Sequence, residues 1–272
     1  MSELEAASSA VKMDAEGIVQ LERRGRVAVV TMRHRPHNLL GPELIGALTR
    51  TFAQTDWAGI GAVVLRSGAR HFCAGGDLAM FEQRVETGDP TCIPPMLPFM
   101  ETMERFPLPI VAAVHGACLG GGFELAMMCD FIVAARSAKI GAVEAALGLQ
   151  PLMGGVQRMV QRCGALRAKE LAMLARRYDA ETLERWNLVN LVVPDDRLDA
   201  TALVIAGELA HGPAKAHEAT KILARIAVNE GVAAADAAME ETQAPIWASQ
   251  DLRIGLAAFR EGGPGSAIFT GH

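Results

Sequence analysis

The chain lacks an excess of basic residues. Its 26 Lys and Arg residues are outnumbered by 31 Asp and Glu, which gives a formal net charge of −5. A protein that binds nucleic acid through the phosphate backbone usually carries a clear basic excess. The composition therefore argues against a general nucleic-acid-binding function, and any phosphate-bearing ligand must be met by a local group of charges.

Cysteine is scarce and shows no pairing pattern. The number of cysteines is odd, and none of them forms a C-x-x-C pair or stands at zinc-ligand spacing. Such usage is typical of a reducing setting, where a buried cysteine acts as a small hydrophobic residue. We therefore expect a cytoplasmic location, without a disulfide framework or a structural zinc site. The five residues are Cys73, Cys92, Cys118, Cys129 and Cys163.

Several catalytic and nucleotide-binding motifs are absent. The sequence contains no G-x-x-x-x-G-K-[ST] phosphate loop, no G-x-S-x-G nucleophile elbow and no H-E-x-x-H metal motif. The run GACLGGG at 116–122 does not have the spacing of the dinucleotide-binding G-x-G-x-x-G motif. Glycines after a strand are thus only weak support for a nicotinamide-dependent oxidoreductase, and we expect no metal site.

Neither an export signal nor a membrane span is expected. The opening MSELEAASSAVKM has acidic residues where a signal peptide is basic and has no continuous apolar region, so we expect residues 1–15 to form a flexible polar arm. The apolar stretch 109–129 is long enough to cross a bilayer, but it contains Glu124 and four glycines. A carboxylate in hydrocarbon is costly and glycines weaken a spanning helix, so no membrane partner is expected.

The length and hydrophobic content are sufficient for a packed core, since 50% of the 272 residues are hydrophobic. Apolar strand-like runs alternate with helical spacing, which is typical of an α/β protein with a sheet covered on both faces. From about residue 167 the pattern is mostly helical, and Asn187 is expected to end one helix as a left-handed cap. We expect a catalytic core over 16–205 and a helical region over 206–272. Strands are expected at 18–22, 26–32, 62–66, 110–115, 131–134 and 139–142, and helices at 42–52 and 123–128.

The stretch RHFCAGGDLAMF at 70–81 combines a strand end, two glycines and an aspartate before a helical run. Such a turn leaves backbone N–H groups free near the start of a helix, and Asp77 is a natural N-cap there. Free N–H groups can bind an anion or a developing oxyanion. An ordinary glycine-containing turn from strand to helix has the same sequence, so this stretch alone leaves both interpretations open.

Two isolated acids stand in apolar, glycine-rich sequence. Glu124 follows three glycines in LGGGFE, and Glu144 lies in KIGAVEAALG. Burying a carboxylate without partners is costly, although a helix N-terminus or a distant arginine would also account for Glu124. Two such acids fit a general acid/base pair, whose pKa values burial raises towards working pH. Whether they face each other does not follow from the sequence.

The chain resembles the enoyl-CoA hydratase/isomerase family, the crotonase superfamily, in six blocks over roughly 18–272. In chain order these are HNLLGPEL, RHFCAGGDL, IVAAVHGACLGGGFELAMMCDFIVA, AKIGAVEAALGLQP, GGVQRM and DAETLERWNLVNLVVP. The resemblance implies an α/β crotonase-like spiral of repeated β-β-α units, with two sheets that meet at a steep angle. It also implies a C-terminal helical trimerisation region, and hence a homotrimer or a dimer of trimers.

The same resemblance implies the residues of a site. The backbone N–H groups of Gly76 and Gly121 correspond to an oxyanion hole for the thioester oxygen of an acyl-CoA. Glu124 corresponds to the residue that activates water for addition at C3, and Glu144 to the one that supplies or removes the C2 proton. Coenzyme A enters as part of the substrate, and neither a metal nor another cofactor is implied. The substrate-binding residues are expected to be Ala74, Gly76, Asp77, Leu78 and Gly121.

The function implied is that of an enoyl-CoA hydratase, a lyase of fatty-acid or related acyl-CoA catabolism. A double-bond isomerase of the same family can work with one acid at the position of Glu144, and the presence of Glu124 favours hydration. Dehalogenation, decarboxylation and ring formation also occur in the superfamily. A non-catalytic acyl-CoA-binding subunit is the alternative from another class, and the retention of both acids argues against it.

Two further groups of residues have two interpretations each. Four arginines can supply positive charge for the CoA phosphates or form a solvated basic loop: Arg33, Arg35, Arg66 and Arg70. Five apolar residues can line an acyl pocket or pack a helix against the core: Met96, Leu97, Phe99, Met100 and Met103.

Overall fold

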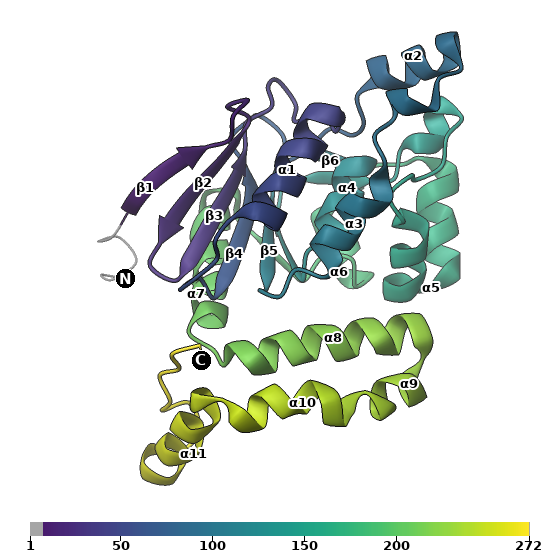
Figure 1. The fold of residues 1–272 in the computed structure, drawn as a ribbon. Coiled ribbons are helices and arrows are strands. Elements are labelled where there is room, and N and C mark those ends of the chain that lie inside the picture. Colours follow the sequence, from purple (N-terminus) through teal and green to yellow (C-terminus); the bar gives the residue numbers. More distant parts are fainter. Residues whose placement is uncertain (1–7, 272) are drawn as a thin grey trace.

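The computed structural model of the chain describes residues 8–271, which form two sheets (Figure 1). Within that range the larger sheet has the strand order β1-β2-β3-β4-β5-β7-β10, and the smaller has the order β6-β8-β9. The first three strands of the larger sheet are antiparallel, and from β3 onward its strands are parallel. The strands are β1 (Ser8–Met13), β2 (Val19–Arg24), β3 (Val27–Met32), β4 (Ala62–Ser67), β5 (Ile110–Val114), β6 (Ala117–Leu119), β7 (Phe131–Ala135), β8 (Lys139–Gly141), β9 (Tyr178–Asp179) and β10 (Leu191–Val193).

The strands and helices predicted from the sequence are confirmed, with ends that move by at most two residues. Gly25 has φ 59° in the two-residue turn that joins β2 to β3, a left-handed conformation that glycine adopts without strain. Helix α1 (Pro42–Gln54) begins with its proline at N1, where a missing N–H has no cost. Asn187 follows α6 (Ala180–Arg185) with φ 61°, which confirms the left-handed cap.

The first strand corrects the expectation of a flexible arm over 1–15. Ser8–Met13 pairs antiparallel with β2, with an irregularity between Ser9 and Lys12. The free edge of β2 offers unpaired N–H and C=O groups to which the preceding chain can add. Residues 1–7 of the expected arm lie outside the described part of the chain.

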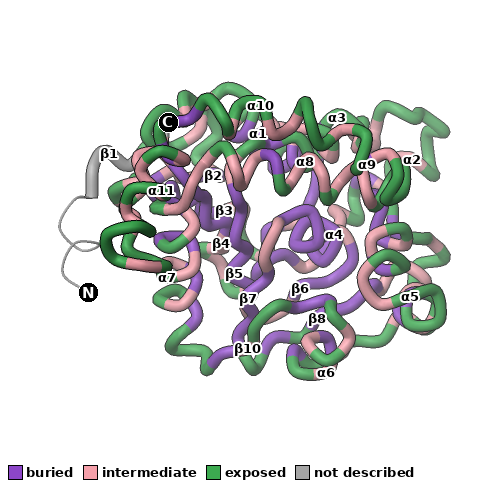
Figure 2. The backbone as a smooth tube through the Cα atoms, turned by 90° about the horizontal axis from the view of Figure 1, so that it is seen from below, coloured by how far each residue is buried: buried purple, intermediate pink, exposed green. Residues whose placement is uncertain are grey.

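The central strands of the larger sheet are buried on both faces, as their apolar sequences predicted. Along β3, Val27 and Val29 pack into one hydrophobic cluster with helix α7 (Leu198–Ala210). The alternate residues Ala28 and Val30 pack into a second cluster on the other face, with α1, α3 (Met96–Glu104) and α4 (Gly121–Met127). Viewed from below, the buried backbone is concentrated in the central strands and in α4 (Figure 2). Helix α4 therefore carries its residues into the interior.

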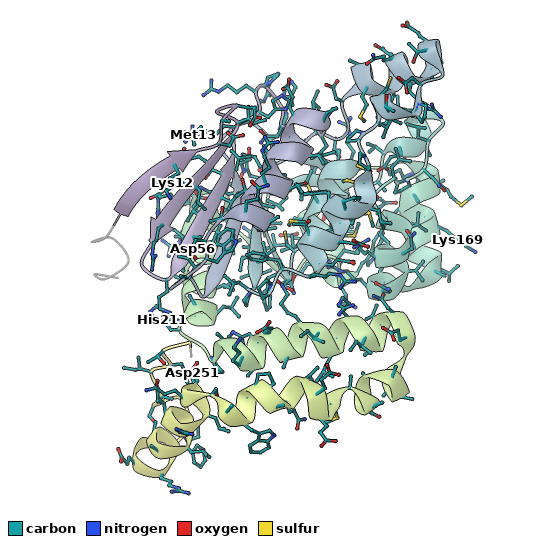
Figure 3. The ribbon with its side chains drawn as sticks, in the orientation of Figure 1. Lys12, Met13, Asp56, Lys169, His211 and Asp251 are labelled. Atoms are coloured by element: carbon teal, nitrogen blue, oxygen red, sulfur yellow. The ribbon has the colours of Figure 1, made fainter. Side chains whose placement is uncertain are left out.

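The C-terminal third is helical, as predicted, but its helix α7 packs on the larger sheet and is part of the core. The boundary expected between 205 and 206 falls inside α7, which packs on β4, β5 and β7 as one element. We therefore propose that the core ends after His211, which Figure 3 labels at the junction. The helices beyond it are α8 (Ala214–Glu230), α9 (Val232–Ala237), α10 (Met239–Ala248) and α11 (Gln250–Gly262), and they lie below the sheet in Figure 1.

One buried carboxylate fixes the end of the described chain. Asp251, in the first turn of α11, is 1% exposed and is labelled in Figure 3. Its Oδ1 accepts hydrogen bonds from the backbone N–H groups of Thr270 and Gly271 at 2.7 and 3.1 Å. This carboxylate therefore holds the C-terminal segment against the helical region.

The apolar stretch 109–129 is divided between β5, β6 and α4 and is not one helix. Across the described part of the chain, no helix combines the length and the apolar character needed to span a bilayer. The five cysteines are free, and three of them are buried: Cys73, Cys118 and Cys129.

Candidate active site

Three consecutive glycines bring the start of α4 against two other segments. Gly120 has φ 52°, and an added Cβ would lie 3.3 Å from Oε1 of Glu144. At Gly122 an added Cβ would collide with the carbonyl oxygen of Cys73. The first glycine therefore allows a left-handed turn and room for an acid, and the third allows close packing of α4 on the neighbouring segment.

Gly121 lies beside the backbone N–H group of Gly76. An added Cβ at Gly121 would lie 3.9 Å from the nitrogen of Gly76. Among the described residues, neither N–H group donates a hydrogen bond. Gly76 is held in place by the neighbouring bonds from Leu40 N to Gly75 O (2.9 Å) and from Asp77 N to Leu40 O (3.1 Å). Two free donors at one place can bind one oxygen atom on which negative charge develops.

Glu124 is a buried carboxylate with a fixed orientation. It lies in α4 and is 3% exposed. Its Oε1 accepts hydrogen bonds from the backbone N–H groups of Met153 (2.7 Å) and Gly155 (2.8 Å). Burial raises the pKa of Glu124, whereas these N–H groups and the positive charge of Arg158 act in the opposite direction because they stabilise the carboxylate.

Glu144 is a half-buried residue whose two carboxyl oxygens are buried. It is the first residue of the 3₁₀ helix η2 (Glu144–Leu147), and within the described residues neither of its carboxyl oxygens has a partner. Burial, together with the nearby negative charge of Glu124, raises the pKa of Glu144 to about 7. A carboxyl group with this pKa can give or take a proton near neutral pH.

These four groups come from separate parts of the fold and converge. Gly76 follows β4, Gly121 and Glu124 begin α4, and Glu144 follows β8. The two acids are close enough for the charge of one to raise the pKa of the other, and Glu144 lies against Gly120. A carboxylate, a carboxylic acid and two free N–H donors can together bind a carbonyl oxygen and move protons at the adjacent carbons.

The remaining residues expected to bind substrate lie in one loop. Asp77 caps α2 (Leu78–Thr87), since its Oδ1 accepts a hydrogen bond from Ala79 N at 3.1 Å, which confirms the predicted N-cap. Leu78 is exposed, and the N–H of Ala74 donates to the carbonyl oxygen of His37 at 3.1 Å. The loop thus has an ordered backbone and an accessible apolar side chain at its end.

The structure separates the members of the two ambiguous groups. Arg66 forms an ion pair with Asp199 of α7 at 2.8 Å, which holds it on the α7 side of the sheet. Arg35 and Arg70 are exposed. In α3, Phe99 and Met103 belong to the core, Met96 and Met100 are partly buried against it, and Leu97 is 64% exposed.

Sequence reasoning missed the residues that hold Glu124. Met153 and Gly155 act through their backbone, and Arg158 contacts the same segment through its side chain. All three lie far from Glu124 along the chain; the nearest, Met153, is 29 residues away. Their segment, PLM followed by GGVQRM, stood out in the sequence only through the family resemblance. A backbone N–H group can belong to almost any residue type, so the sequence does not mark it as a donor.

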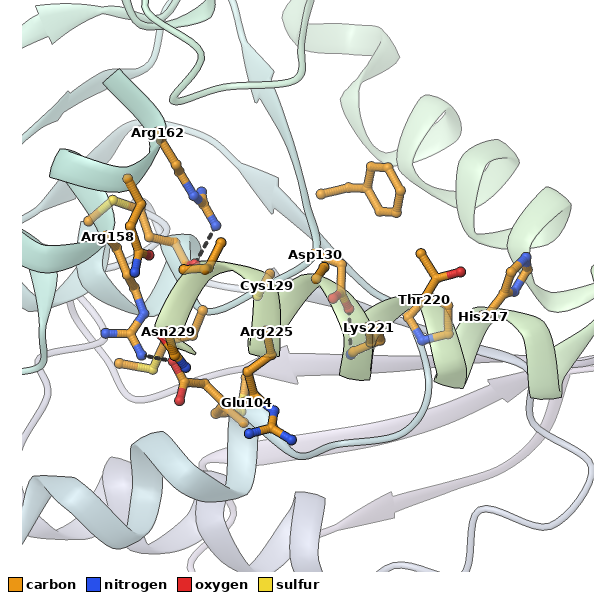
Figure 4. A pocket seen from close by; sticks show the side chains of 18 of the residues that line it. Glu104, Cys129, Asp130, Arg158, Arg162, His217, Thr220, Lys221, Arg225 and Asn229 are labelled. Atoms are coloured by element: carbon orange, nitrogen blue, oxygen red, sulfur yellow. Dashed lines mark hydrogen bonds and ion pairs between the residues drawn. The ribbon is translucent and has the colours of Figure 1, made fainter. Parts of the chain in front are cut away.

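A cavity of about 460 Å³ lies apart from this site, between α8 and the end of the core where α4 stops and β7 begins (Figure 4). Neither Glu124 nor Glu144 lines it. Its two carboxylates are both paired, Glu104 with Arg158 and Asp130 with Lys221, the latter at 2.7 Å. Arg158 therefore connects this cavity with the segment that holds Glu124. Within the described residues, no group of three or more His, Cys, Asp or Glu side chains has an arrangement that could hold a metal ion.

Known proteins match nearly the whole chain. The sequence profile described as Enoyl-CoA hydratase/isomerase matches residues 22–266. A protein named probable enoyl-CoA hydratase from Rhizobium meliloti is 35% identical over 246 residues, which cover 88% of this chain and 93% of the relative. The human protein named enoyl-CoA hydratase domain-containing protein 2, mitochondrial, is 32% identical over 244 residues, with 88% and 84% of the two chains covered.

Solved structures share the fold. The crystal structure of a putative enoyl-CoA hydratase from Streptomyces coelicolor A3(2) has a TM-score of 0.86 and 29% identity, and 100% of both chains is covered. The enoyl-CoA hydratase structure from Bacillus anthracis has a TM-score of 0.85 and 29% identity, with 94% of this chain and 100% of that chain covered. The similarity therefore includes the sheets and the C-terminal helices.

Proposed function

The chain belongs to the enoyl-CoA hydratase/isomerase family of the crotonase superfamily, and on that basis we propose that it is an enoyl-CoA hydratase. The reaction would add water reversibly across the C2–C3 double bond of a 2-enoyl-CoA. The observation that supports this function best is the pair of acids Glu124 and Glu144, whose carboxyl groups are buried, beside Gly76 and Gly121, whose N–H groups have no partner among the described residues. A fatty-acid or related acyl-CoA is the proposed substrate.

In the proposed mechanism the thioester oxygen binds to the N–H groups of Gly76 and Gly121. Addition at C3 moves negative charge onto that oxygen as an enolate forms. Donors that are already in place stabilise this charge without reorganisation, and one such donor typically contributes about 3–4 kcal/mol to the lowering of the barrier. Because both donors belong to the backbone, they are held by β4, the Leu40 bridge and α4 rather than by flexible side chains.

The two acids divide the proton transfers between them. Glu124 accepts a proton from water while the water oxygen bonds to C3, and Glu144 in its protonated form gives its proton to C2 of the enolate. The reverse reaction moves the same protons back, so the balance requires neither a metal nor a redox group. Glu124 is suited to the base role because two N–H groups stabilise its carboxylate, and Glu144 to the acid role because burial keeps it protonated up to about pH 7.

The experiment that tests this function follows the absorbance of the conjugated thioester in crotonyl-CoA and in longer 2-enoyl-CoAs. We expect the absorbance to fall in the presence of the protein as 3-hydroxyacyl-CoA forms. The same assay on 3-enoyl-CoAs, in which absorbance would rise, tests the isomerase alternative, for which Glu144 alone is sufficient. If neither short nor long 2-enoyl-CoAs are hydrated, the proposal is wrong, and acyl-CoA binding without turnover would favour the non-catalytic alternative.

The C-terminal helices support a further expectation, that the chain assembles as a homotrimer or a dimer of trimers. Large apolar side chains of this region are exposed in the single chain, including Trp247 (71%), Phe259 (61%) and Leu256 (53%). Exposed apolar groups of this kind mark contact surfaces between proteins. Light scattering on the purified protein is expected to give the mass of three or six chains, and Phe259→Glu is expected to lower it. A monomeric wild type at micromolar concentration would contradict this expectation.

A further inference from the structure

The segment 153–155 is bound from two sides by opposite charges. On one side, the N–H groups of Met153 and Gly155 donate to Oε1 of Glu124 at 2.7 and 2.8 Å. On the other side, the carbonyl oxygens of Met153 and Gly154 accept hydrogen bonds from Nη1 of Arg158 at 3.2 and 3.1 Å. Hydrogen bonds in a chain polarise and strengthen one another. The Gly154 carbonyl and the Gly155 N–H belong to the same peptide unit, so the cation on that carbonyl makes the Gly155 N–H a better donor to the carboxylate.

The geometry of the segment leaves Arg158 little freedom. Gly154 has φ 77°, and an added Cβ there would collide with Nη1 of Arg158 and lie 3.0 Å from Cε of Met100. The side chain of Arg158 is 11% exposed, and its Nη2 forms an ion pair with Glu104, the last residue of α3. Figure 4 shows this pair at one end of the cavity beside α8. One line of contacts therefore joins α3 through Arg158 to the peptide units that orient Glu124.

We propose that Arg158 is a positioning residue for Glu124 and that Glu104 holds Arg158 in place. Arg158 forms no hydrogen bond with the carboxylate of Glu124; it fixes the carbonyl groups of Met153 and Gly154, so that the N–H groups of Met153 and Gly155 present a constant binding site to Oε1. The proposal rests on the proposed hydratase function, in which Glu124 activates water, and adds to it the residues that set the orientation and charge of that base.

The charges around Glu124 allow the role of Arg158 to be tested by the direction in which the pKa of Glu124 moves. Two charged groups face it, Arg158 from α5 (Gly155–Leu174) and Glu144 from η2. Arg162 lies beside Arg158, one turn further along α5, and Glu104 faces Arg158 from α3. Removing the positive charge of Arg158 raises the pKa of Glu124 further. Removing the negative charge of Glu104 leaves the positive charge of Arg158 unopposed, and the pKa of Glu124 does not rise.

The first experiment compares Arg158→Met and Arg158→Lys with wild type in the hydration assay as a function of pH. For Arg158→Met we expect kcat to fall about 10- to 100-fold with a smaller change in KM, because the base is displaced rather than the substrate. The acid limb of the kcat profile, which reports deprotonation of Glu124, is expected to move to higher pH. Arg158→Lys, which keeps the charge and a donor, is expected to return the limb towards its wild-type position and to recover part of kcat.

Two further variants separate positioning from a general loss of stability. Glu104→Gln is expected to lower kcat less than Arg158→Met and to leave the acid limb in place or move it down. Lys221→Met removes the other ion pair of the same cavity, and we expect its kcat and acid limb to match wild type even if its melting temperature falls. If Arg158→Met and Glu104→Gln both lose activity with unmoved acid limbs, the role of Arg158 is only structural and the proposal is overturned.

A titration without substrate distinguishes failure of this proposal from failure of the proposed function. In protein labelled with ¹³C at the glutamate carboxyl carbon, the Glu124 signal is identified by its absence from Glu124→Gln. Its titration midpoint is expected to be higher in Arg158→Met than in wild type, whether or not the protein hydrates enoyl-CoA. An inactive wild type with this shift refutes hydration and supports positioning. An active wild type without any shift, and with an unchanged kcat in Arg158→Met, refutes positioning alone.

Discussion

Glu144→Gln is expected to lower kcat/KM for hydration of 2-enoyl-CoA by about 10²–10⁴-fold, the usual contribution of a positioned general acid. Glutamine keeps the size of the side chain but cannot give a proton to C2. Both oxygens of Glu144 are buried without a hydrogen-bond partner among the described residues, so no neighbouring group is placed there to take over the transfer. The loss is expected in kcat more than in KM because the proton moves only in the transition state.

The pH dependence of the same reaction follows from the pKa of Glu144, which burial raises to about 7. Below that value the folded protein carries the protonated acid that hydration requires, and the rate is expected to fall as pH rises through about 7. In the reverse direction, which begins from the carboxylate, the rate is expected to rise over the same range. A kcat/KM profile for hydration measured from pH 5 to 9 should show this limb in wild type, and the limb should be absent from Glu144→Gln.

Glu124→Gln completes the test of the two acids. We expect a loss of similar size, because glutamine cannot accept a proton from water. The exposed glutamate Glu101 of α3 offers a matched control, and Glu101→Gln is expected to retain wild-type rates. Full activity of Glu124→Gln beside an inactive Glu144→Gln would point to isomerase chemistry instead.

The second large effect is expected at Gly121, from comparison of Gly121→Pro with Gly121→Ala. Both variants add a Cβ, which would lie 3.0 Å from Cδ1 of Leu40, the flexible end of that side chain. Only proline removes the N–H group, and Gly121 is the first residue of α4, a position at which proline is well tolerated. Proline also places its Cδ where the N–H group pointed, so the difference between the two variants reports the loss of the donor together with this steric change.

We expect kcat/KM of Gly121→Pro to lie about 10²–10³-fold below that of Gly121→Ala, the loss typical of one oxyanion donor. Thermal unfolding followed by circular dichroism checks that both variants fold. Equal kcat/KM values for the two folded variants would show that the N–H group of Gly121 does not stabilise the developing charge, and the catalytic donor would have to be sought elsewhere.

Local features of this protein were predictable because they depend on neighbouring residues. Asp77 caps α2 through the N–H group two residues later, Pro42 begins α1, and Asn187 ends α6 in a left-handed conformation. The alternating contacts of β3 with two clusters likewise follow from an uninterrupted apolar run. Each of these rules acts over a few residues, so the order of residues carries the necessary information.

Other features depended on distant segments and were not predictable from pattern. The strand Ser8–Met13 has a polar beginning, and it forms because the edge of β2 is available. The sequence made Arg66 a candidate for binding the CoA phosphates. In the structure it pairs with Asp199, which lies 133 residues away on the helix that covers the sheet. The change from core to C-terminal helices is set by where α7 stops packing on the sheet.

The sequence by itself determined that two isolated acids and a glycine triplet stand in apolar surroundings, that the chain alternates strands and helices, and that its blocks resemble one enzyme family. Only the tertiary structure decided that Glu124 and Glu144 are neighbours and that they differ in environment. Oε1 of Glu124 is held by two N–H groups from residues 153 and 155, whereas the buried carboxyl oxygens of Glu144 have no hydrogen-bond partner within residues 8–271. The physical reason is that desolvation and charge stabilisation depend on the atoms that surround a carboxyl group, and these come from segments that folding alone brings together.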